Sequence, residues 1–376
     1  MVEIYEMGPI RPPNEAESLL IRVTRNCPWN KCLFCPVYKN RKFSKRSVEE
    51  VLSDINNIKE GEKKVKEIAV KLTGEEKVTK EAVKEVYSSE RRYLQIALWL
   101  QGGGKNVFLQ DADNIAVKTE DLAQILRNIK ETFPQVERIT TYARAKTASK
   151  KSVKELKELK EAGLTRVHLG LETGHGPLLE YIKKGVTPDE QIEGGLKIKE
   201  AGLSLSEYVI LGLGGQDLIT EHALDTARVL SKIDPHYIRV RTLGIREGIP
   251  LVEKVRESEL RLASDIEILK EKKLLIENLD VDSYFRSDHI LNLLEEVNGK
   301  LPEDKEKMIN IIDEFLELTE KEQQNFCVGR RLGLYRFAGD MGNKELFNRV
   351  DILKEDLENR GKSPERLICD LGGRFI

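Results

Sequence analysis

The chain has 376 residues, of which 40% are hydrophobic and 34% are charged, and its formal net charge is −2. This length suits two domains, or one large α/β domain with an extension, and the hydrophobic content permits a sizeable core. The small net charge excludes a general attraction to nucleic acid, and no apolar run approaches membrane-spanning length. We therefore expect a cytoplasmic protein, in a compartment where thiols stay reduced.

The first predicted strand, 18–24, is apolar and β-branched, and a cysteine-rich loop follows it. Three of the five cysteines in the chain, Cys27, Cys32 and Cys35, have the spacing C-x4-C-x2-C. Thiolates are soft ligands that select zinc, copper(I) or iron–sulfur clusters. Three thiolates leave one position of a four-ligand set open, and an open position on a metal permits chemistry.

The surrounding sequence distinguishes between the kinds of site that these three thiols could form. A disulfide framework is disfavoured because the cysteine count is odd and the thiols are clustered. Structural zinc sites usually add a second pair of Cys or His, whereas the next histidine here is His168. A plant-type [2Fe–2S] site requires a fourth cysteine, and the next one is Cys327. We expect a [4Fe–4S] cluster on three cysteines, with zinc as the alternative.

A strand followed by a three-cysteine loop, with Phe34 before the last cysteine, resembles the radical S-adenosylmethionine (radical SAM) superfamily. The segment Arg22–Cys35 is similar to an oxidoreductase-type branch related to coproporphyrinogen-oxidase and tRNA-modifying members. The first gap is one residue longer than in the common C-x3-C-x2-C spacing. The resemblance implies a [4Fe–4S] cluster on Cys27, Cys32 and Cys35, with S-adenosylmethionine on the fourth iron.

The resemblance also implies a fold and a reaction. The fold is a partial (β/α)6 barrel similar to a TIM barrel. In the reaction, a one-electron donor such as ferredoxin or flavodoxin reduces the cluster, and S-adenosylmethionine is cleaved to a 5′-deoxyadenosyl radical. That radical abstracts hydrogen from a substrate, while the protein positions the cofactor and excludes water.

A charged helical insertion is predicted at about residues 61–104, between the first and second barrel strands. A capping box at 47–50 begins the preceding helix, and three glycines at 102–104 end the insertion. We expect a surface elaboration that packs on the barrel, with a lid hinged at the glycines as the alternative. The basic run at 39–46 indicates a solvated helix entry, or else a contact for an acidic electron donor or anionic substrate.

Five further strands alternate with helices, a rhythm typical of a parallel sheet or barrel. They are predicted at Asn106–Leu109, Arg138–Tyr142, Arg166–Leu171, Glu207–Leu211 and Tyr237–Val240. Periodicity alone does not separate an open sheet from a barrel. The superfamily resemblance favours the partial barrel.

The residues just after each strand are the expected site, because the carboxyl ends of the strands form the reactive end of α/β barrels. The resemblance predicts that the cofactor is bound by Phe34, Asp111, Asp113, Arg144, Glu172, Leu211 and Arg241. Relatives commonly have a glycine-rich turn after the second strand, and that turn is absent here. Asp111 or Asp113 would meet the cofactor ammonium group instead, or else would cap the helix beginning near Thr119.

The residues after the remaining strands are expected to contact the other parts of the cofactor. Arg144 would clamp the carboxylate group bidentately, and Glu172 would accept hydrogen bonds from the ribose hydroxyls. The main chain at Leu211 would lie against adenine. For Arg241 the alternative is an ordinary ion pair at the rim.

We predict a core barrel over residues 1–250 and a mostly helical region over 251–376 that closes the barrel. Within that region a long helix is predicted over 251–273 and a strand over 274–281. This region is expected to shape the substrate pocket.

The carboxyl-terminal region contains four further polar or thiol side chains with possible roles: Asp288, His289, Cys327 and Cys369. Asp288 and His289 begin an apolar segment that is predicted to be a helix. We expect them to cap this helix or to make satisfied hydrogen bonds, with a role in lining a pocket as the alternative. Cys327 and Cys369 are expected to pack as small hydrophobes, with hydrogen donation or methyl transfer by Cys369 as the alternative.

We expect an enzyme that acts on a small molecule, with no membrane or nucleic-acid partner. A phosphate-binding loop is absent, which disfavours a kinase or nucleotide triphosphatase. Two alternatives stay open: modification of RNA or a protein, docked through the basic run and the insertion, and a non-catalytic iron–sulfur or zinc-binding protein.

Overall fold

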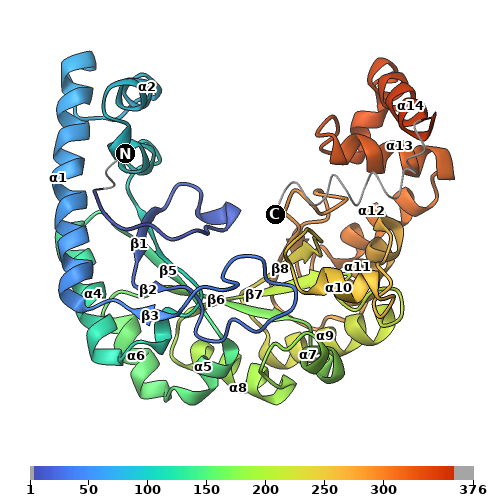
Figure 1. Ribbon diagram of the computed structural model, residues 1–376, viewed down its shortest axis with the longest axis horizontal. Coiled ribbons are helices and arrows are strands. Elements are labelled where there is room, and N and C mark those ends of the chain that lie inside the picture. Colours follow the sequence, from blue (N-terminus) through green and yellow to red (C-terminus); the bar gives the residue numbers. More distant parts are fainter. Residues whose placement is uncertain (1–3, 360–376) are drawn as a thin grey trace. The chain divides into compact units, whose positions relative to one another are not determined.

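The computed structural model describes residues 4–359 and has an α/β fold built on one mostly parallel sheet (Figure 1). Its strand order is β1-β4-β5-β6-β7-β8-β9-β10. The six parallel strands that follow chain order are β1 (Leu19–Arg22), β4 (Asn106–Gln110), β5 (Arg138–Ala143), β6 (Arg166–Glu172), β7 (Ser204–Leu211) and β8 (Tyr237–Thr242). Consecutive strands as neighbours give the connectivity of a barrel, whereas a doubly wound sheet reverses its order at a switch point. The predicted α/β fold of six βα units is confirmed.

Four short strands complete the sheets, and none of them was predicted. β9 (Tyr284–Arg286) pairs parallel with β8, and β10 (Gly299–Lys300) pairs antiparallel with β9. β2 (Thr24–Arg25) and β3 (Ser44–Lys45) form a separate antiparallel pair that closes the base of the cysteine loop. Two or three residues are too few to show an alternating pattern, so sequence periodicity does not reveal such strands.

The carboxyl-terminal helices differ from the expectation at two places. The predicted helix over 251–273 is two helices, α10 (Leu251–Arg256) and α11 (Asp265–Asn278), because a capping box between Ser264 and Glu267 starts a new helix. The predicted strand over 274–281 is wrong, since α11 continues through most of it. Leu275 and Ile276 of this run are buried, on a helix that packs against α9 and α12.

The chain forms two compact units. The first contains residues 1–30, 37–169 and 193–205, and the second contains 31–36, 170–192 and 206–376. The division into a core over 1–250 and a closing region over 251–376 stays a prediction. Among residues 4–359, no helix is both long enough and apolar enough to cross a membrane.

In the first unit a layer of helices covers the aliphatic face of the strands. Its helices are η1 (Pro13–Glu15), α1 (Val48–Thr73), α2 (Lys80–Ser89), η2 (Arg91–Tyr93), α3 (Leu94–Gln101), η3 (Asn114–Ala116), α4 (Thr119–Thr132), α5 (Ala145–Lys150) and α6 (Val153–Glu161). Contacts run from α1 to α4 and from α4 to α6. On the other face of the sheet, Tyr142 packs edge-on against Phe108 at 5.1 Å and lies 5.7 Å from the ring of buried His168.

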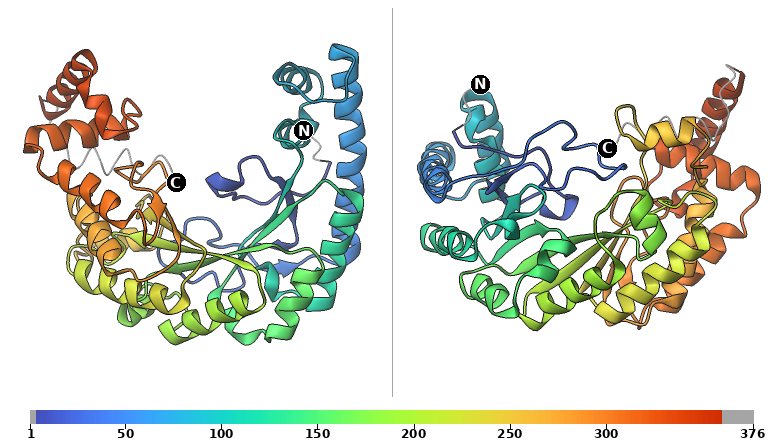
Figure 2. Two further views of the ribbon diagram at one scale, coloured as in Figure 1. Left: turned by 180° about the vertical axis from the view of Figure 1, so that it is seen from behind. Right: turned by 60° about the horizontal axis from the view of Figure 1, so that its bottom comes forward.

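The helical insertion is confirmed, although α1 runs through its predicted start without a break. Figure 2 shows α2 beside α1 from behind, and α3 also packs against α1. A Cβ atom at Gly61 would lie 2.5 Å from Cδ1 of Ile96 on α3. Glycine therefore lets α3 approach the middle of a 26-residue helix.

The second unit is mostly helical beyond β8, as predicted. Its helices are α7 (Gly176–Tyr181), α9 (Ile219–Ile233), α10, α11, α12 (Lys305–Leu316), α13 (Glu320–Arg331), η4 (Ala338–Gly342) and α14 (Lys344–Asn359), while α8 (Pro188–Glu200) contributes to both units. α11 packs between α9 and α12, and α13 packs on α14. The predicted helix at Asp288 is absent, because residues 287–298 form turns.

Candidate functional site

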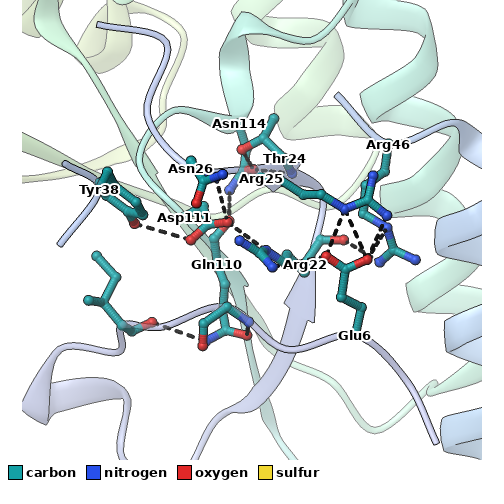
Figure 3. Close-up of polar contacts among 12 residues, drawn as sticks. Glu6, Arg22, Thr24, Arg25, Asn26, Tyr38, Arg46, Gln110, Asp111 and Asn114 are labelled. Carbon is teal, nitrogen blue, oxygen red and sulfur yellow. Dashed lines mark hydrogen bonds and ion pairs between the residues drawn. The ribbon is translucent and has the colours of Figure 1, made fainter. Parts of the chain in front are cut away.

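A buried carboxylate anchors the start of the cysteine loop. Asp111, the residue after β4, is fully buried and has φ 71°. Its Oδ2 accepts hydrogen bonds from Arg22 Nε at 2.6 Å and from the Asn26 backbone N–H at 3.0 Å, and its Oδ1 accepts one from the Tyr38 hydroxyl at 3.1 Å (Figure 3). Asn26 directly precedes Cys27. Asp111 therefore fixes the entry of the cysteine loop, and its contact with the cofactor ammonium group stays a prediction.

Asn114 joins three strand ends through a fully buried amide group (Figure 3). Its Oδ1 accepts from the Thr24 backbone N–H at 3.2 Å and from the Thr24 hydroxyl at 2.8 Å. Its Nδ2 donates to the carbonyl oxygens of Leu109 and Gln110 and to the hydroxyl of Thr141, at 2.9–3.0 Å. Both ends of the amide are satisfied, as a buried polar group requires. Asn114 thus holds β2 against the ends of β4 and β5.

Three arginines surround Glu6, which lies before β1 in the chain (Figure 3). Glu6 forms ion pairs with Arg22 at 2.9 Å, Arg25 at 2.6 Å and Arg46 at 3.4 Å. Hydrogen bonding from Arg25, together with the charges of Arg46 and Arg22, lowers the pKa of Glu6. Arg46 also pairs with Asp54 on α1 at 2.6 Å. This network ties the amino-terminal segment and α1 to the base of the cysteine loop.

Cys27, Cys32 and Cys35 are partly exposed. The Cys27 Sγ accepts a hydrogen bond from the Asn30 backbone N–H at 3.5 Å, and the Cys35 N–H donates to the Cys32 carbonyl at 3.4 Å. Asn30 has φ 49° and also donates from its side chain to the Arg41 carbonyl at 3.2 Å.

The donor chemistry of the loop fits an iron–sulfur cluster, since soft thiols with N–H···S bonds are the ligands that such clusters use. Cys27 belongs to the first unit and Cys32 and Cys35 belong to the second. Within residues 4–359, no three Cys, His, Asp or Glu side chains already converge on one metal position.

Asp113 and Arg144 meet at the start of α5. The fully buried Asp113 accepts from the Arg144 backbone N–H at 3.3 Å and from the Thr147 hydroxyl at 2.5 Å. Burial raises the pKa of Asp113 to about 6, although both hydrogen bonds oppose the shift. The Arg144 guanidinium lies 5.1 Å from the Trp29 ring centroid. The alternative in which these aspartates cap the helix at Thr119 is wrong, because α4 has no side-chain cap.

Glu172 and Lys184 form a buried ion pair in the second unit. Glu172, at the end of β6, has φ 64°, and its Oε1 accepts from Lys184 Nζ at 2.6 Å. Lys184 also lies 5.7 Å from the Phe34 ring centroid. A Cβ atom at Gly170 would lie within 3 Å of both side chains, so glycine makes room for the pair. Burial, and then the charge of Glu172, raise the pKa of the neighbouring Glu207 well above its ordinary value.

The turn after β7 is held by a carboxylate from α11. The Leu211 carbonyl accepts from the Leu243 N–H at 2.9 Å, and the Gly212 N–H donates to Glu271 Oε2 at 2.6 Å. Glu271 is buried and its other oxygen contacts His222 Nδ1. Gly212 has φ 76°, which favours glycine. The backbone of this turn is therefore fixed from outside the sheet.

Arg241 and Arg239, two residues apart on β8, share one carboxylate. Arg239 Nη1 donates to Asp288 Oδ2 at 2.7 Å, and Arg241 Nη1 donates to Asp288 Oδ1 at 3.0 Å. Burial alone would raise the pKa of Asp288, but the charges of Arg241 and Arg239 outweigh it and lower that pKa. Arg241 therefore makes the ion pair given as its alternative role. Its contact with S-adenosylmethionine stays a prediction.

The two remaining cysteines differ in what the structure describes. Cys327 lies on α13 and is buried, and burial raises the pKa of its thiol well above the ordinary value. Cys369 lies outside the described residues.

The family model of the Radical SAM superfamily matches residues 21–227, more than half of the chain. The chain belongs to the radical SAM superfamily. It is accordingly an enzyme whose family uses a [4Fe–4S] cluster and S-adenosylmethionine and requires a reductant and a substrate.

Individual relatives are distant. A tRNA uridine(34) acetyltransferase of Methanocaldococcus jannaschii is 26% identical over 110 residues, which cover 29% of this chain and 20% of that protein. The chain thus matches about a fifth of the length of that curated relative. Among solved structures, methylornithine synthase has a TM-score of 0.43 at 18% identity, covering 70% of this chain and 63% of that one. Coproporphyrinogen III oxidase of Escherichia coli has a TM-score of 0.39 at 12% identity, covering 96% and 90%.

Proposed function

We propose that Cys27, Cys32 and Cys35 hold the [4Fe–4S] cluster, and that this enzyme removes a hydrogen atom from a small-molecule substrate. When bound, the cluster and S-adenosylmethionine supply one-electron cleavage of the sulfonium and a 5′-deoxyadenosyl radical. The observation that carries the proposal is the anchored loop: Asp111 accepts a hydrogen bond from the Asn26 backbone N–H next to Cys27, and the side chains of Arg22 and Tyr38 hold its carboxylate in place. An anchored loop entry lowers the entropy lost when the Cys27 thiolate is ordered on the cluster.

The strand ends have separate tasks in this proposal. Glu172 accepts hydrogen bonds from the ribose hydroxyls, and Lys184 orients that carboxylate before the cofactor binds. Arg144, held against Trp29, faces the cofactor carboxylate. The main chain at Leu211, fixed through its neighbour Gly212, lies against adenine.

Asp111 and Asp113 act mainly as positioning groups in this proposal. Asp111 orients the cysteine loop, and Asp113 orients the backbone of Arg144 at the start of α5. Both carboxylates already accept hydrogen bonds from the protein, so a cofactor ammonium group would compete with those donors.

A small substrate is supported by the second unit, which contains a cavity of about 710 Å³ lined by Asp288, Arg330 and Tyr335 among others. Small-molecule sites commonly have volumes of this order. The net charge of −2 gives no general attraction to polyanions. We propose ferredoxin or flavodoxin as the electron donor.

Anaerobic reconstitution tests the cluster assignment. The chain should take up about four irons, as one [4Fe–4S] cluster requires, and form 5′-deoxyadenosine with a reductant and S-adenosylmethionine. Cys32→Ala should lose the iron, whereas Cys327→Ala, which changes a buried thiol on α13, should retain it. Zinc in place of iron, or full iron content in Cys32→Ala, would contradict the proposal.

The match to a tRNA uridine(34) acetyltransferase favours one second candidate, in which the substrate is tRNA. Binding of tRNA should then weaken steeply with salt, because phosphate contacts release counterions. Retention of 5′-deoxyadenosine formation without any tRNA binding would exclude this candidate and leave the small-molecule proposal standing.

A further inference from the structure

The arginine pair on β8 lies on one face of the second unit's sheet. Residues two apart on a strand share a face, so Arg239 and Arg241 project together. Aromatic rings lie beside both guanidinium groups: Tyr208 is 5.0 Å from that of Arg241, and Tyr237 is 5.7 Å from that of Arg239. Stacking fixes the plane of a guanidinium and thus the direction of its donors.

Two donor nitrogens of this pair lack an acceptor in the part of the chain that the structure describes. Arg241 Nη2 and Arg239 Nε are buried, and neither has a hydrogen-bond partner among residues 4–359. Unsatisfied buried donors cost free energy and call for a physical explanation. Two guanidinium groups share the single carboxylate of Asp288, so the group of three carries a net positive charge.

Asp288 is the accessible member of the group. Its side chain is 34% exposed, compared with 7% for Arg239 and 13% for Arg241. Asp288 also lines the cavity of about 710 Å³. A ligand in that cavity would therefore reach Asp288, the residue that joins the cavity lining to the two arginines.

The local potential supports the same direction of charge. Burial, followed by the charge of Arg241, lowers the pKa of the adjacent His289 to about 4. Arg331 and Arg330 also lower that pKa, while Asp288 alone opposes them. The arginines thus contribute positive charge at His289, while Glu295 and Asp340 add negative charge to the cavity lining.

We propose that Arg239 and Arg241 bind an oxyanion of the substrate, a carboxylate or a phosphate group, and that Asp288 is the counterion that this oxyanion displaces. This role replaces the cofactor contact predicted for Arg241 from the sequence. The planar donors of arginine match both groups bidentately. This inference rests on the proposed function for the role of the ligand as substrate. Binding of the anion itself depends only on the second unit.

Calorimetric titration of the cluster-loaded enzyme with inorganic phosphate and, separately, with acetate tests the proposal at constant ionic strength. At least one probe should bind saturably, and the tighter one identifies the group that the substrate carries. Arg241→Gln and Arg239→Gln should each weaken binding roughly tenfold or more. Asp288→Asn should tighten it by a similar factor, because the competing negative charge is removed.

Arg261→Gln is the matched control, since Arg261 is an exposed arginine of the same unit that pairs with Asp217. Its affinity for either probe should equal that of the wild type. Three results would each overturn the site. They are weaker anion binding in Asp288→Asn, equal anion affinities in the arginine variants and the control, and no saturable binding of either probe. Circular dichroism of each variant verifies folding.

The same preparations separate this inference from the proposed function. Anion binding in an enzyme that forms no 5′-deoxyadenosine would overturn the proposed function while supporting the site. Normal 5′-deoxyadenosine formation without anion binding would overturn the site alone.

Discussion

At the scale of single residues, Asp111 concentrates three donors on one buried carboxylate next to the cysteine loop. Asp111→Asn should reduce the free energy of unfolding by about 3 kcal/mol, because it removes the charge that pairs with Arg22 inside the protein. It should also reduce the iron taken up on reconstitution, since Asn26 loses its anchor. Urea unfolding and iron analysis measure the two effects.

Asp113→Asn is the control for that prediction. Asp113 is equally buried and two residues away, but its carboxylate contacts Arg144 and Thr147 rather than the loop. It should retain the iron content of the wild type. Equal iron loss in both variants would mean that the contact of Asp111 with the loop does not govern cluster uptake.

Glu172 gives a second prediction at this scale. Glu172→Gln should weaken S-adenosylmethionine binding roughly tenfold or more, as expected when one charged hydrogen-bonding partner is removed, and should leave the cluster spectrum unchanged. Equilibrium binding to the reconstituted enzyme measures this. Glu259→Gln, which alters an exposed ion pair with Lys254 in the same unit, should have no effect. An unchanged affinity in Glu172→Gln would show that the strand ends are misassigned.

The strand-end rule found residues on the strands but missed the residues that hold them. The positions of Glu172 and Arg241 follow from where β6 and β8 end. Lys184, which pairs with Glu172, comes from a loop, and Glu271, which holds Gly212 after β7, comes from α11 far along the chain. Asp288, the partner of Arg241, was predicted to cap a helix, make hydrogen bonds or line a pocket, but not to pair with this strand end. A charged residue in a polar helix or loop carries no local signal that it will fold back onto a strand end.

At the scale of elements, local sequence signals predicted where helices start. They did not predict the type of element where tertiary packing determines it. The capping boxes at Ser47 and Ser152 begin α1 and α6 as predicted, because their hydrogen bonds lie within four residues. The apolar run at 274–281 satisfies both strand and helix patterns, and contacts of α11 with α9 and α12 select the helix.

A glycine prediction belongs to this scale. Gly174 follows β6, and a Cβ atom there would lie 2.4 Å from the Asp225 carbonyl oxygen and 2.7 Å from the Thr226 Cα on α9. Because both are backbone atoms, Gly174→Ala should separate α9 from the turn and cost about 2 kcal/mol of stability. Urea unfolding measures the loss.

Gly176→Ala is the matched control for the glycine prediction. The nearest atom to a Cβ there lies 3.7 Å away, an ordinary contact distance. Its stability should lie close to that of the wild type. Similar losses of stability in the two variants would show that flexibility of the turn, rather than the close approach of α9, is the reason for glycine at position 174.

At the scale of the whole molecule, connectivity was predictable because each βα unit repeats the same local pattern. The order β1-β4-β5-β6-β7-β8 follows the chain, so no long-range information was needed to place neighbours. The strands β9 and β10 were not predictable, since two or three residues join the sheet only through pairing with β8 and with each other.

The pH dependence of global stability gives the last prediction, through Asp113. Burial raises the pKa of this carboxyl from 3.8 to about 6 in the folded protein. Between these values the folded chain binds more protons than the unfolded chain, so stability falls as pH rises, by about 3 kcal/mol in total. Asp113→Asn, which mimics the neutral acid, lacks this loss. The difference in unfolding free energy between the variant and the wild type should therefore grow in favour of the variant from about pH 4 to about pH 7. Urea unfolding of both chains across this range measures the difference, in which the titration of distant groups cancels. A difference that stays constant with pH would show that Asp113 ionises normally in the folded protein.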